Sequence, residues 1–361
     1  MKYLISGGGT GGHIFPAVSI ANALRELDSE ARILFVGALG RMEMQRVPEA
    51  GYQIVGLPVR GFDRRHLLRN IGVLFDLCRS LIRARRIVRN FAPDVAVGVG
   101  GYASGAAMKV AARMGVPVLL QEQNGFAGVT NKLLKNDADV ICVAYEGMER
   151  FFPKEKIILT GNPVRQNLLA PTNLMCDAPS SPTLLIIGGS LGARTINQAI
   201  AAGLGDLRDA GVRVIWQTGK AYFEQCQQAA APYAGEWLQC TDFLTDMPVA
   251  YAQADLVISR AGASSISEIC LLGKPAILVP SPNVAEDHQT HNAMALVNKD
   301  AAVLVKDVDA SSSLVATALS LIKDTARLKT LREHALTMAQ PDSARRIAEQ
   351  VIRLANLRKE K

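Results

Sequence analysis

Residues 4–24 read LISGGGTGGHIFPAVSIANAL, an apolar run followed by a glycine turn and an amphipathic helical pattern. The same plan recurs in the middle of the chain, where residues 185–204 read LIIGGSLGARTINQAIAAGL. Around these two stretches, short aliphatic runs alternate with helical patterns. Such alternation is typical of parallel strands joined by helices. The sequence therefore predicts an α/β protein with two halves of similar construction.

The length supports a division into two domains, because 361 residues exceed one ordinary domain of about 100–200 residues. Asn-Pro in GNPVR, near residue 162, interrupts regular structure and marks the boundary. We expect an N-terminal domain over 1–162, whose first helix covers about Phe15–Leu27, and a C-terminal domain over 163–341. A last helix within 342–361 could pack back on the first domain.

Composition restricts the class of protein. Hydrophobic residues make up 49% of the chain and charged residues 20%, which is typical of a folded globular protein. No stretch approaches the roughly 20 uninterrupted apolar residues that span a bilayer, and no export signal is visible. Six scattered cysteines without a CxxC pair favour reduced thiols in a cytosol. The sequence predicts a protein that does not cross the membrane.

The net charge of +7 favours an acidic partner, and its distribution is uneven. Nine arginines lie between Arg60 and Arg89, against only Asp63 and Asp76. Apolar residues are interleaved with these arginines. The stretch 60–90 is therefore either a basic amphipathic surface or a core helix with a solvated polar face.

The first glycine turn has GxGxxG spacing at Gly7, Gly9 and Gly12, between a predicted strand and a helix, where backbone N–H groups can receive phosphate. A dinucleotide site is disfavoured because the second strand ends in GALG, without an acidic residue for a ribose. No Lys-Ser/Thr pair follows the glycines, which excludes a P-loop. His13, directly after the turn, is either a catalytic base or a helix histidine that only bonds to the turn.

Two further glycine turns follow predicted strands. GVGGYASG at 98–105 could bind a ligand or allow close packing of helix and strand. GGSLGAR at 188–194 opens the second half and offers Ser190 at a helix start, which suits a phosphate. Three such turns in one chain favour phosphate binding more strongly than any one of them.

The segment 255–280, DLVISRAGASSISEICLLGKPAILVP, contains a strand ending at Ser259 and a turn of small residues. Ser265 and Glu268 have the spacing of a capping box, so Glu268 could merely cap its own helix. Alternatively, the helix start receives a diphosphate and the carboxylate accepts both hydroxyls of a ribose. Downstream, His288, Gln289 and Asn292 form a polar group suited to sugar hydroxyls.

Seven motifs occur in the order and spacing of one family: GGGTGGHIFPA, GVGGYASG, QEQN with GVTNK, GNPVR, GGSLGAR, SRAGASSISE and DHQTHNA. The chain resembles the MurG family, the UDP-N-acetylglucosamine:lipid I N-acetylglucosaminyltransferases of bacterial cell-wall synthesis, from Met1 to about Ala295. The resemblance implies a GT-B fold, in which two Rossmann-like parallel-sheet domains face each other across a cleft.

The resemblance also implies roles for individual residues. His13 is the candidate catalytic base, and the acceptor diphosphate would contact Gly7, Gly9, Gly12, Gly100, Gly101 and Tyr102. One departure from the family is Gln121, where many relatives have His, which questions a role for that position. The donor UDP-N-acetylglucosamine would contact Thr10, Gly11, Gly12, Asn124, Arg165, Ser190, Phe243, Leu244, Ala263, Ser264, Glu268 and Gln289.

Given these roles, the expected reaction is an inverting transfer to the C4 hydroxyl of lipid I that requires neither cofactor nor metal. Asp137 and Asp139 have the DxD spacing of manganese-dependent transferases, but they lead into an apolar strand, so we expect no metal there. The partners implied are UDP-N-acetylglucosamine, lipid I and an anionic membrane surface reached through stretch 60–90. The expected location is peripheral, on the cytoplasmic face of the bacterial membrane.

Alternatives remain at this level. A transferase that builds a membrane glycolipid or a UDP-sugar epimerase would use the same fold, and a nucleotide-sugar sensor or membrane-docked scaffold would bind without turnover. Nucleic acid is not an expected partner, because the basic stretch contains few aromatics and no recognised binding module. The sequence does not determine the oligomeric state.

Overall fold

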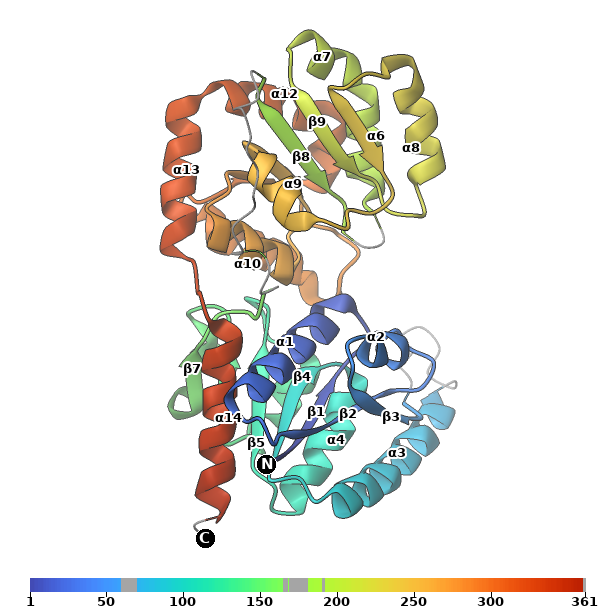
Figure 1. The fold of residues 1–361 in the computed structure, drawn as a ribbon, viewed down its shortest axis with the longest axis vertical. Coiled ribbons are helices and arrows are strands. Elements are labelled where there is room, and N and C mark those ends of the chain that lie inside the picture. The colour runs from blue at the N-terminus through green and yellow to red at the C-terminus, as the bar shows by residue number, and fades with distance from the viewer. Residues whose placement is uncertain (60–69, 165–167, 169–180, 190–191, 360–361) are drawn as a thin grey trace. The chain divides into compact units, whose positions relative to one another are not determined.

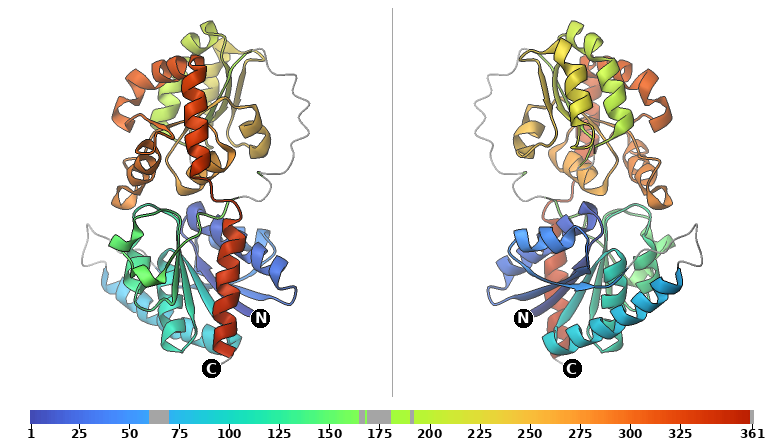
Figure 2. Two further views of the ribbon diagram at one scale, coloured as in Figure 1. Left: turned by 90° about the vertical axis from the view of Figure 1, so that its left-hand side faces the viewer. Right: turned by 90° about the vertical axis from the view of Figure 1, so that its right-hand side faces the viewer.

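The structure is a computed structural model that describes residues 1–59, 70–164, 168, 181–189 and 192–359. The chain divides into two compact units, the first formed by Met1–Val164 with Asp342–Lys361 and the second by Arg165–Pro341. Each unit is built on one sheet of parallel strands with helices packed on it (Figures 1 and 2). The prediction of two parallel-sheet α/β domains is confirmed.

Unit 1 contains a seven-stranded sheet in the order β3-β2-β1-β4-β5-β6-β7. Its strands are β1 (Lys2–Gly7), β2 (Arg32–Ala38), β3 (Gln53–Leu57), β4 (Val95–Gly100), β5 (Val118–Glu122), β6 (Val140–Val143) and β7 (Ile157–Leu159). Its α-helices are α1 (Gly11–Leu27), α2 (Glu43–Glu49), α3 (Asn70–Phe91), α4 (Tyr102–Arg113), α5 (Val129–Leu134) and α14 (Ser343–Lys359).

Unit 2 contains a six-stranded sheet in the order β10-β9-β8-β11-β12-β13. Its strands are β8 (Thr183–Ile187), β9 (Arg213–Gln217), β10 (Leu238–Thr241), β11 (Leu256–Ser259), β12 (Ala276–Leu278) and β13 (Val303–Leu304). Its α-helices are α6 (Arg194–Ala202), α7 (Leu204–Asp209), α8 (Phe223–Ala230), α9 (Met247–Gln253), α10 (Ala263–Leu272), α11 (His288–Val297), α12 (Ala310–Lys323) and α13 (Thr325–Thr337).

Strand order brings the glycine turns together within each unit. In unit 1, β1 pairs with both β2 and β4, so the turns that follow β1 and β4 lie next to each other. In unit 2, β8 pairs with both β9 and β11, so the turns that follow β8 and β11 also lie next to each other. Open α/β sheets bind ligands at such switch points, outside the carboxyl ends of the strands.

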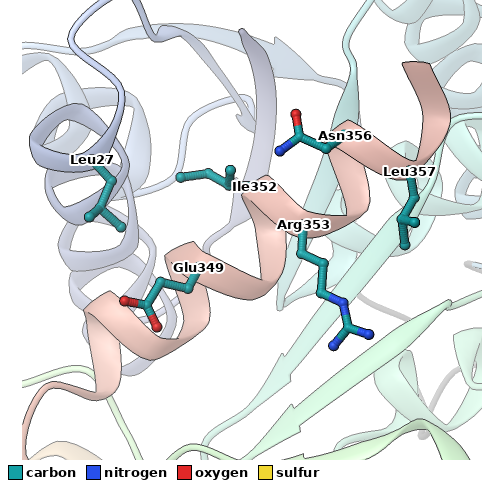
Figure 3. A pocket seen from close by; sticks show the side chains of 6 residues that line it. All are labelled: Leu27, Glu349, Ile352, Arg353, Asn356 and Leu357. Carbon is teal, nitrogen blue, oxygen red and sulfur yellow. The ribbon is translucent and has the colours of Figure 1, made fainter. Parts of the chain in front are cut away.

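The last helix, α14, is part of unit 1. Ile347, Val351 and Ala355 are fully buried in one apolar cluster with Ile20 and Leu24 of α1. Their spacing of four residues places them on one face of α14, which is the face that α1 covers. A hollow lies along these two helices, lined by Leu27 of α1 and five residues of α14 (Figure 3).

Helix α1 starts at Gly11, four residues before the expected start at Phe15. The carbonyl oxygen of Thr10 accepts hydrogen bonds from the backbone N–H of His13 and Ile14, which begins the helix inside the glycine turn. Glycines are poor helix formers in isolation, so the sequence pattern placed the start too late. The consequence is that His13 lies in the first turn of α1.

Candidate active site

His13 is held by the turn that precedes it. Its Nδ1 lies 3.0 Å from the carbonyl oxygen of Gly8 and 3.3 Å from Oγ1 of Thr10. A carbonyl oxygen only accepts, so the Gly8 contact assigns the proton to Nδ1 and, in the neutral ring, leaves the Nε2 lone pair able to accept a proton. This is the tautomer that a general base needs.

The turn after β4 packs directly on this histidine and on the first turn. At Gly100, whose φ is +105°, an added Cβ would lie 2.9 Å from Nε2 of His13. At Gly101, whose φ is +90°, it would lie 2.5 Å from the carbonyl oxygen of Gly8. Only glycine fits such positions. The structure thus brings the predicted residues of the two turns together, with Tyr102 60% exposed beside them.

A buried carboxyl group accepts a hydrogen bond from the backbone of the first turn. Glu43, the first residue of α2, is fully buried, and its Oε2 accepts the N–H of Gly9 at 2.9 Å. Its Oε1 accepts the N–H of Ala38, at the end of β2, at the same distance. Sequence reasoning missed Glu43, because a single glutamate in RMEMQR carries no signal of burial.

The loop after β5 carries Asn124 and is organised by its neighbour Glu122. One carboxylate oxygen of Glu122 lies 3.1 Å from the N–H of Asn124, and the other accepts from the N–H of Gly128 and from Nδ2 of Asn131. Gln121, the position that departs from the family, donates from Nε2 to Oδ1 of Asn162 at 2.9 Å within the fold. Asn124 is therefore presented by a loop with a fixed shape.

In unit 2, an amide side chain supports the turn after β8. Gln217, at the end of β9, is 4% exposed, and its Nε2 donates to the carbonyl oxygen of Gly189 at 3.0 Å and of Asp242 at 3.4 Å. It thereby connects the turn to the loop that carries Phe243, which is 48% exposed, and Leu244, which is buried. Ser190 and Arg165 lie outside the described residues.

Helix α10 starts at Ala263, which places Ala263 and Ser264 in its first turn, as a diphosphate contact requires. Its N-cap is Gly262, and no side chain caps the helix. The alternative interpretation, in which Ser265 and Glu268 form a capping box, is therefore wrong. The small-residue turn after β11 sets the helix start two residues before Ser265, so Glu268 lies too far along the helix to cap it.

Glu268 instead interacts with a neighbouring helix. Its Oε2 accepts the phenol O–H of Tyr251, from α9, at 3.0 Å, and the two residues are only 6% and 1% exposed. Downstream, Oε1 of Gln289 accepts the N–H of Ser281, and Nδ2 of the buried Asn292 donates to the carbonyl oxygen of Ala261. Asn292 thus supports the α10 turn, and Gln289 lies at the start of α11.

The two aspartates with DxD spacing have structural partners. Both carboxylate oxygens of Asp137 lie 2.8 Å from Nζ of Lys109, and Oδ2 of Asp139 accepts the N–H of Val118 at 2.8 Å. Across the described part of the chain, no group of three or more His, Cys, Asp or Glu residues has the arrangement of a metal site.

Comparison with known proteins assigns the chain to a family. Residues 3–143 match the model of the glycosyltransferase family 28 N-terminal domain, and residues 183–350 match that of its C-terminal domain. A UDP-N-acetylglucosamine–N-acetylmuramyl-(pentapeptide) pyrophosphoryl-undecaprenol N-acetylglucosamine transferase from Bacteroides fragilis is 62% identical, over 98% of this chain and 96% of that protein.

Solved structures show the same fold. MurG of Acinetobacter baumannii superposes with a TM-score of 0.79 at 26% identity, over 98% of this chain and all of the other. A UDP-N-acetylglucosamine 2-epimerase superposes with a TM-score of 0.66 over the whole chain and 98% of the other, but at 13% identity it shares the fold alone. The fold is GT-B, and the chain belongs to the MurG family of N-acetylglucosamine transferases.

Proposed function

We propose that the chain transfers N-acetylglucosamine from UDP-N-acetylglucosamine to the C4 hydroxyl of the N-acetylmuramyl residue of lipid I and forms lipid II with inversion at the anomeric carbon. The observation that carries the proposal is 62% identity over nearly the full length to a transferase named for that reaction. The bond from the C4 oxygen to the anomeric carbon forms as the bond to UDP breaks, and UDP leaves with the electron pair.

His13 is the proposed general base. The Gly8 carbonyl holds the proton on Nδ1, so Nε2 takes the proton of the C4 hydroxyl as the new bond forms. The absence of a side chain at Gly100 leaves room for the ring, because an added Cβ would lie only 2.9 Å from Nε2. A positioned base of this kind contributes about 10²–10⁴-fold to the rate.

Unit 2 is the proposed donor site. The N-terminus of α10, at Ala263 and Ser264, provides backbone N–H groups and the positive end of a helix dipole for the diphosphate. Glu268 accepts the ribose hydroxyls, Gln289 binds the sugar, and Phe243 and Leu244 contact the nucleotide. Developing charge on UDP is met by these fixed dipoles, which need no reorganisation during the reaction.

Unit 1 is the proposed acceptor site, and its first turn restricts how a diphosphate binds. The N–H of Gly8 lies 3.3 Å from the carbonyl oxygen of Gly100, and that of Gly9 donates to Glu43. The amides at the start of α1, Gly11 and Gly12, are therefore better placed to receive an anion than those of Gly8 and Gly9.

One assay tests the reaction and its alternatives. Radiolabelled UDP-N-acetylglucosamine is incubated with a short-chain lipid I analogue in the presence of EDTA, and disaccharide product is expected. Conversion of the donor without acceptor would instead identify an epimerase, and binding without turnover a sensor. Transfer that stops in EDTA and returns with Mn²⁺ would contradict metal independence.

Membrane docking is proposed through α3. Ser80, Ala84 and Val88 are its buried face, whereas Phe75 and Ile82 are 71% and 57% exposed. Helical spacing places Phe75 and Ile82 on the side opposite the buried face, in line with Arg79 and Arg86. A solvated polar face would not expose these two apolar side chains, so the observation favours a basic amphipathic surface for anionic lipid. Residues 60–69 of the predicted stretch lie outside the described part.

Charge reversal tests this surface. A variant with Arg79→Glu, Arg83→Glu and Arg86→Glu is expected to bind anionic vesicles more than tenfold more weakly, because each cation near the surface contributes about 1 kcal/mol. The matched control reverses three exposed cations of unit 2, Lys323, Lys329 and Arg332. Equal losses in both variants, or none in either, would contradict docking through α3. Among the described helices, none is both long and apolar enough to cross a membrane.

A further inference from the structure

A buried tyrosine touches the carboxyl group to which ribose recognition is assigned. Tyr251 lies in α9 and Glu268 in α10, 17 residues apart in sequence. The phenol donates to Oε2 of Glu268 at 3.0 Å, and both side chains are almost completely buried. This contact joins two separate helices of unit 2 at the carboxyl group itself.

Such a contact restricts the orientation of the carboxylate. A carboxylate has about four lone-pair positions, so the phenol of Tyr251 occupies one of them and the two hydroxyls of a diol would require two others. Hydrogen bonds to a charged group are stronger than those between neutral groups, and burial strengthens them further. Rotation of the Glu268 carboxylate would break this bond. Tyr251 therefore favours one orientation of the carboxylate oxygens that would accept the ribose hydroxyls.

Helix α9 also connects this contact to the nucleotide loop. The carboxylate of Asp246 caps the start of α9 by accepting the N–H of Val249, and Leu244 and Phe243 lie two and three residues before Asp246. The helix contains only seven residues, from Met247 to Gln253, so its capped start and Tyr251 are about one turn apart. The loop and the ribose carboxyl are thereby held by one short element.

We propose that Tyr251 is a positioning residue for donor recognition, which holds Glu268 in the orientation that accepts the ribose hydroxyls of the nucleoside diphosphate. The proposal rests on the ribose-binding role of Glu268 given above. Tyr251 acts through Glu268 and makes no contact with the reacting atoms. Its loss therefore affects donor binding and leaves the chemical step almost unchanged.

The kinetic test is Tyr251→Phe, which removes one oxygen atom and preserves the buried ring. We expect the KM for UDP-N-acetylglucosamine to rise about tenfold, with kcat and the KM for the lipid I analogue within twofold of the parent. Tyr3→Phe is the matched control, because Tyr3 is a fully buried tyrosine of unit 1 that donates to the carboxylate of Asp28. A fall in kcat with no change in donor KM would overturn the proposal.

A binding test separates positioning from a general structural role. Calorimetry compares UDP with 2′,3′-dideoxy-UDP, which lacks both ribose hydroxyls. In Tyr251→Phe, UDP affinity is expected to fall about tenfold while dideoxy-UDP affinity stays within twofold, so the preference for UDP shrinks. Equal weakening of both ligands would show a structural role and overturn the proposal. The ratio of affinities is independent of the fraction of folded protein.

Glu268→Gln separates two outcomes: that Tyr251 does not position Glu268, or that Glu268 does not bind the ribose. If Glu268→Gln abolishes the preference for UDP and Tyr251→Phe preserves it, Glu268 binds the ribose and the positioning role of Tyr251 is wrong. If Glu268→Gln itself preserves the preference, the ribose assignment is wrong and the proposal for Tyr251 falls with it.

Discussion

The glycine turns that open the two units share a sequence plan but are supported by opposite chemistry. In unit 1, the carboxyl group of Glu43 accepts an N–H of the turn, that of Gly9. In unit 2, the amide of Gln217 donates to a carbonyl oxygen of the turn, that of Gly189. Glu43 occupies a backbone N–H of its turn and adds an acidic group. Gln217 occupies a backbone carbonyl oxygen of its turn and adds no charge.

A glycine-rich turn is therefore not by itself an anion site. An anion needs N–H groups that the protein has not already used. At the first turn, the N–H groups of Gly8 and Gly9 have partners inside the unit, and the turn orients His13 through the Gly8 carbonyl. The N–H groups of Gly8 and Gly9 are thus less suited to receiving an anion than the glycine spacing alone suggests.

The largest effect is expected from His13→Ala. If the first turn exists to position a base, kcat falls by about 10²–10⁴-fold while the donor KM changes little. Steady-state kinetics with labelled donor measures both constants. His334→Ala, in α13 of unit 2, is the control and should retain parental kcat. Full turnover in His13→Ala would show that another group is the base and that the first turn does not serve to position it.

The second-largest effect is expected from removal of the Glu43 carboxyl group. Glu43→Ala leaves the buried N–H of Ala38 and the partly buried N–H of Gly9 without their charged acceptor, so the free energy of unfolding should fall by about 2–4 kcal/mol. Urea titration measures the change, and Glu49→Ala on the exposed side of the same helix serves as control. Parental stability in Glu43→Ala would mean that the turn holds its shape without the carboxyl group.

A smaller effect is expected when the side-chain amide of Gln217 is removed. Gln217→Leu removes two hydrogen bonds to carbonyl oxygens and should raise the donor KM by about tenfold, with the acceptor KM unchanged. The control is Gln227→Leu, at an exposed position of α8. Should Gln217→Leu alter the acceptor KM instead, the assignment of the second turn to the donor would be wrong.

The smallest effect is expected from Gly9→Ala. The φ of Gly9 is +87° and an added Cβ would meet no atom within 4 Å, so the cost is the backbone term alone, about 1–2 kcal/mol. Gly211→Ala, at φ +68° in equally open space, calibrates that cost away from both turns. A much larger loss of unfolding free energy at Gly9 would show that the Glu43 contact constrains the turn further.

Sequence reasoning located the elements around the candidate site where its signals are local. The glycine turns follow the predicted strands and a strand ends at Ser259, as short-range patterns indicated, whereas the start of α1 was predicted four residues too late. Gln217 had a readable signal, because a polar residue closes the apolar strand RVIWQ. The contacts of Glu43 with the glycine turn and of Tyr251 with Glu268 had none, since Gly9 lies 34 residues from Glu43 and Glu268 lies 17 residues from Tyr251.

Two parallel α/β sheets and the turns at their carboxyl ends were predictable from local patterns, because buried parallel strands are apolar runs and glycine turns are encoded by neighbouring residues. Only the tertiary structure decided that α14 packs on α1, that Glu268 bonds to Tyr251 instead of capping its helix, and that Glu43 supports the first turn. A buried polar group must find a partner, and that partner is selected by packing in space and not by position in the chain.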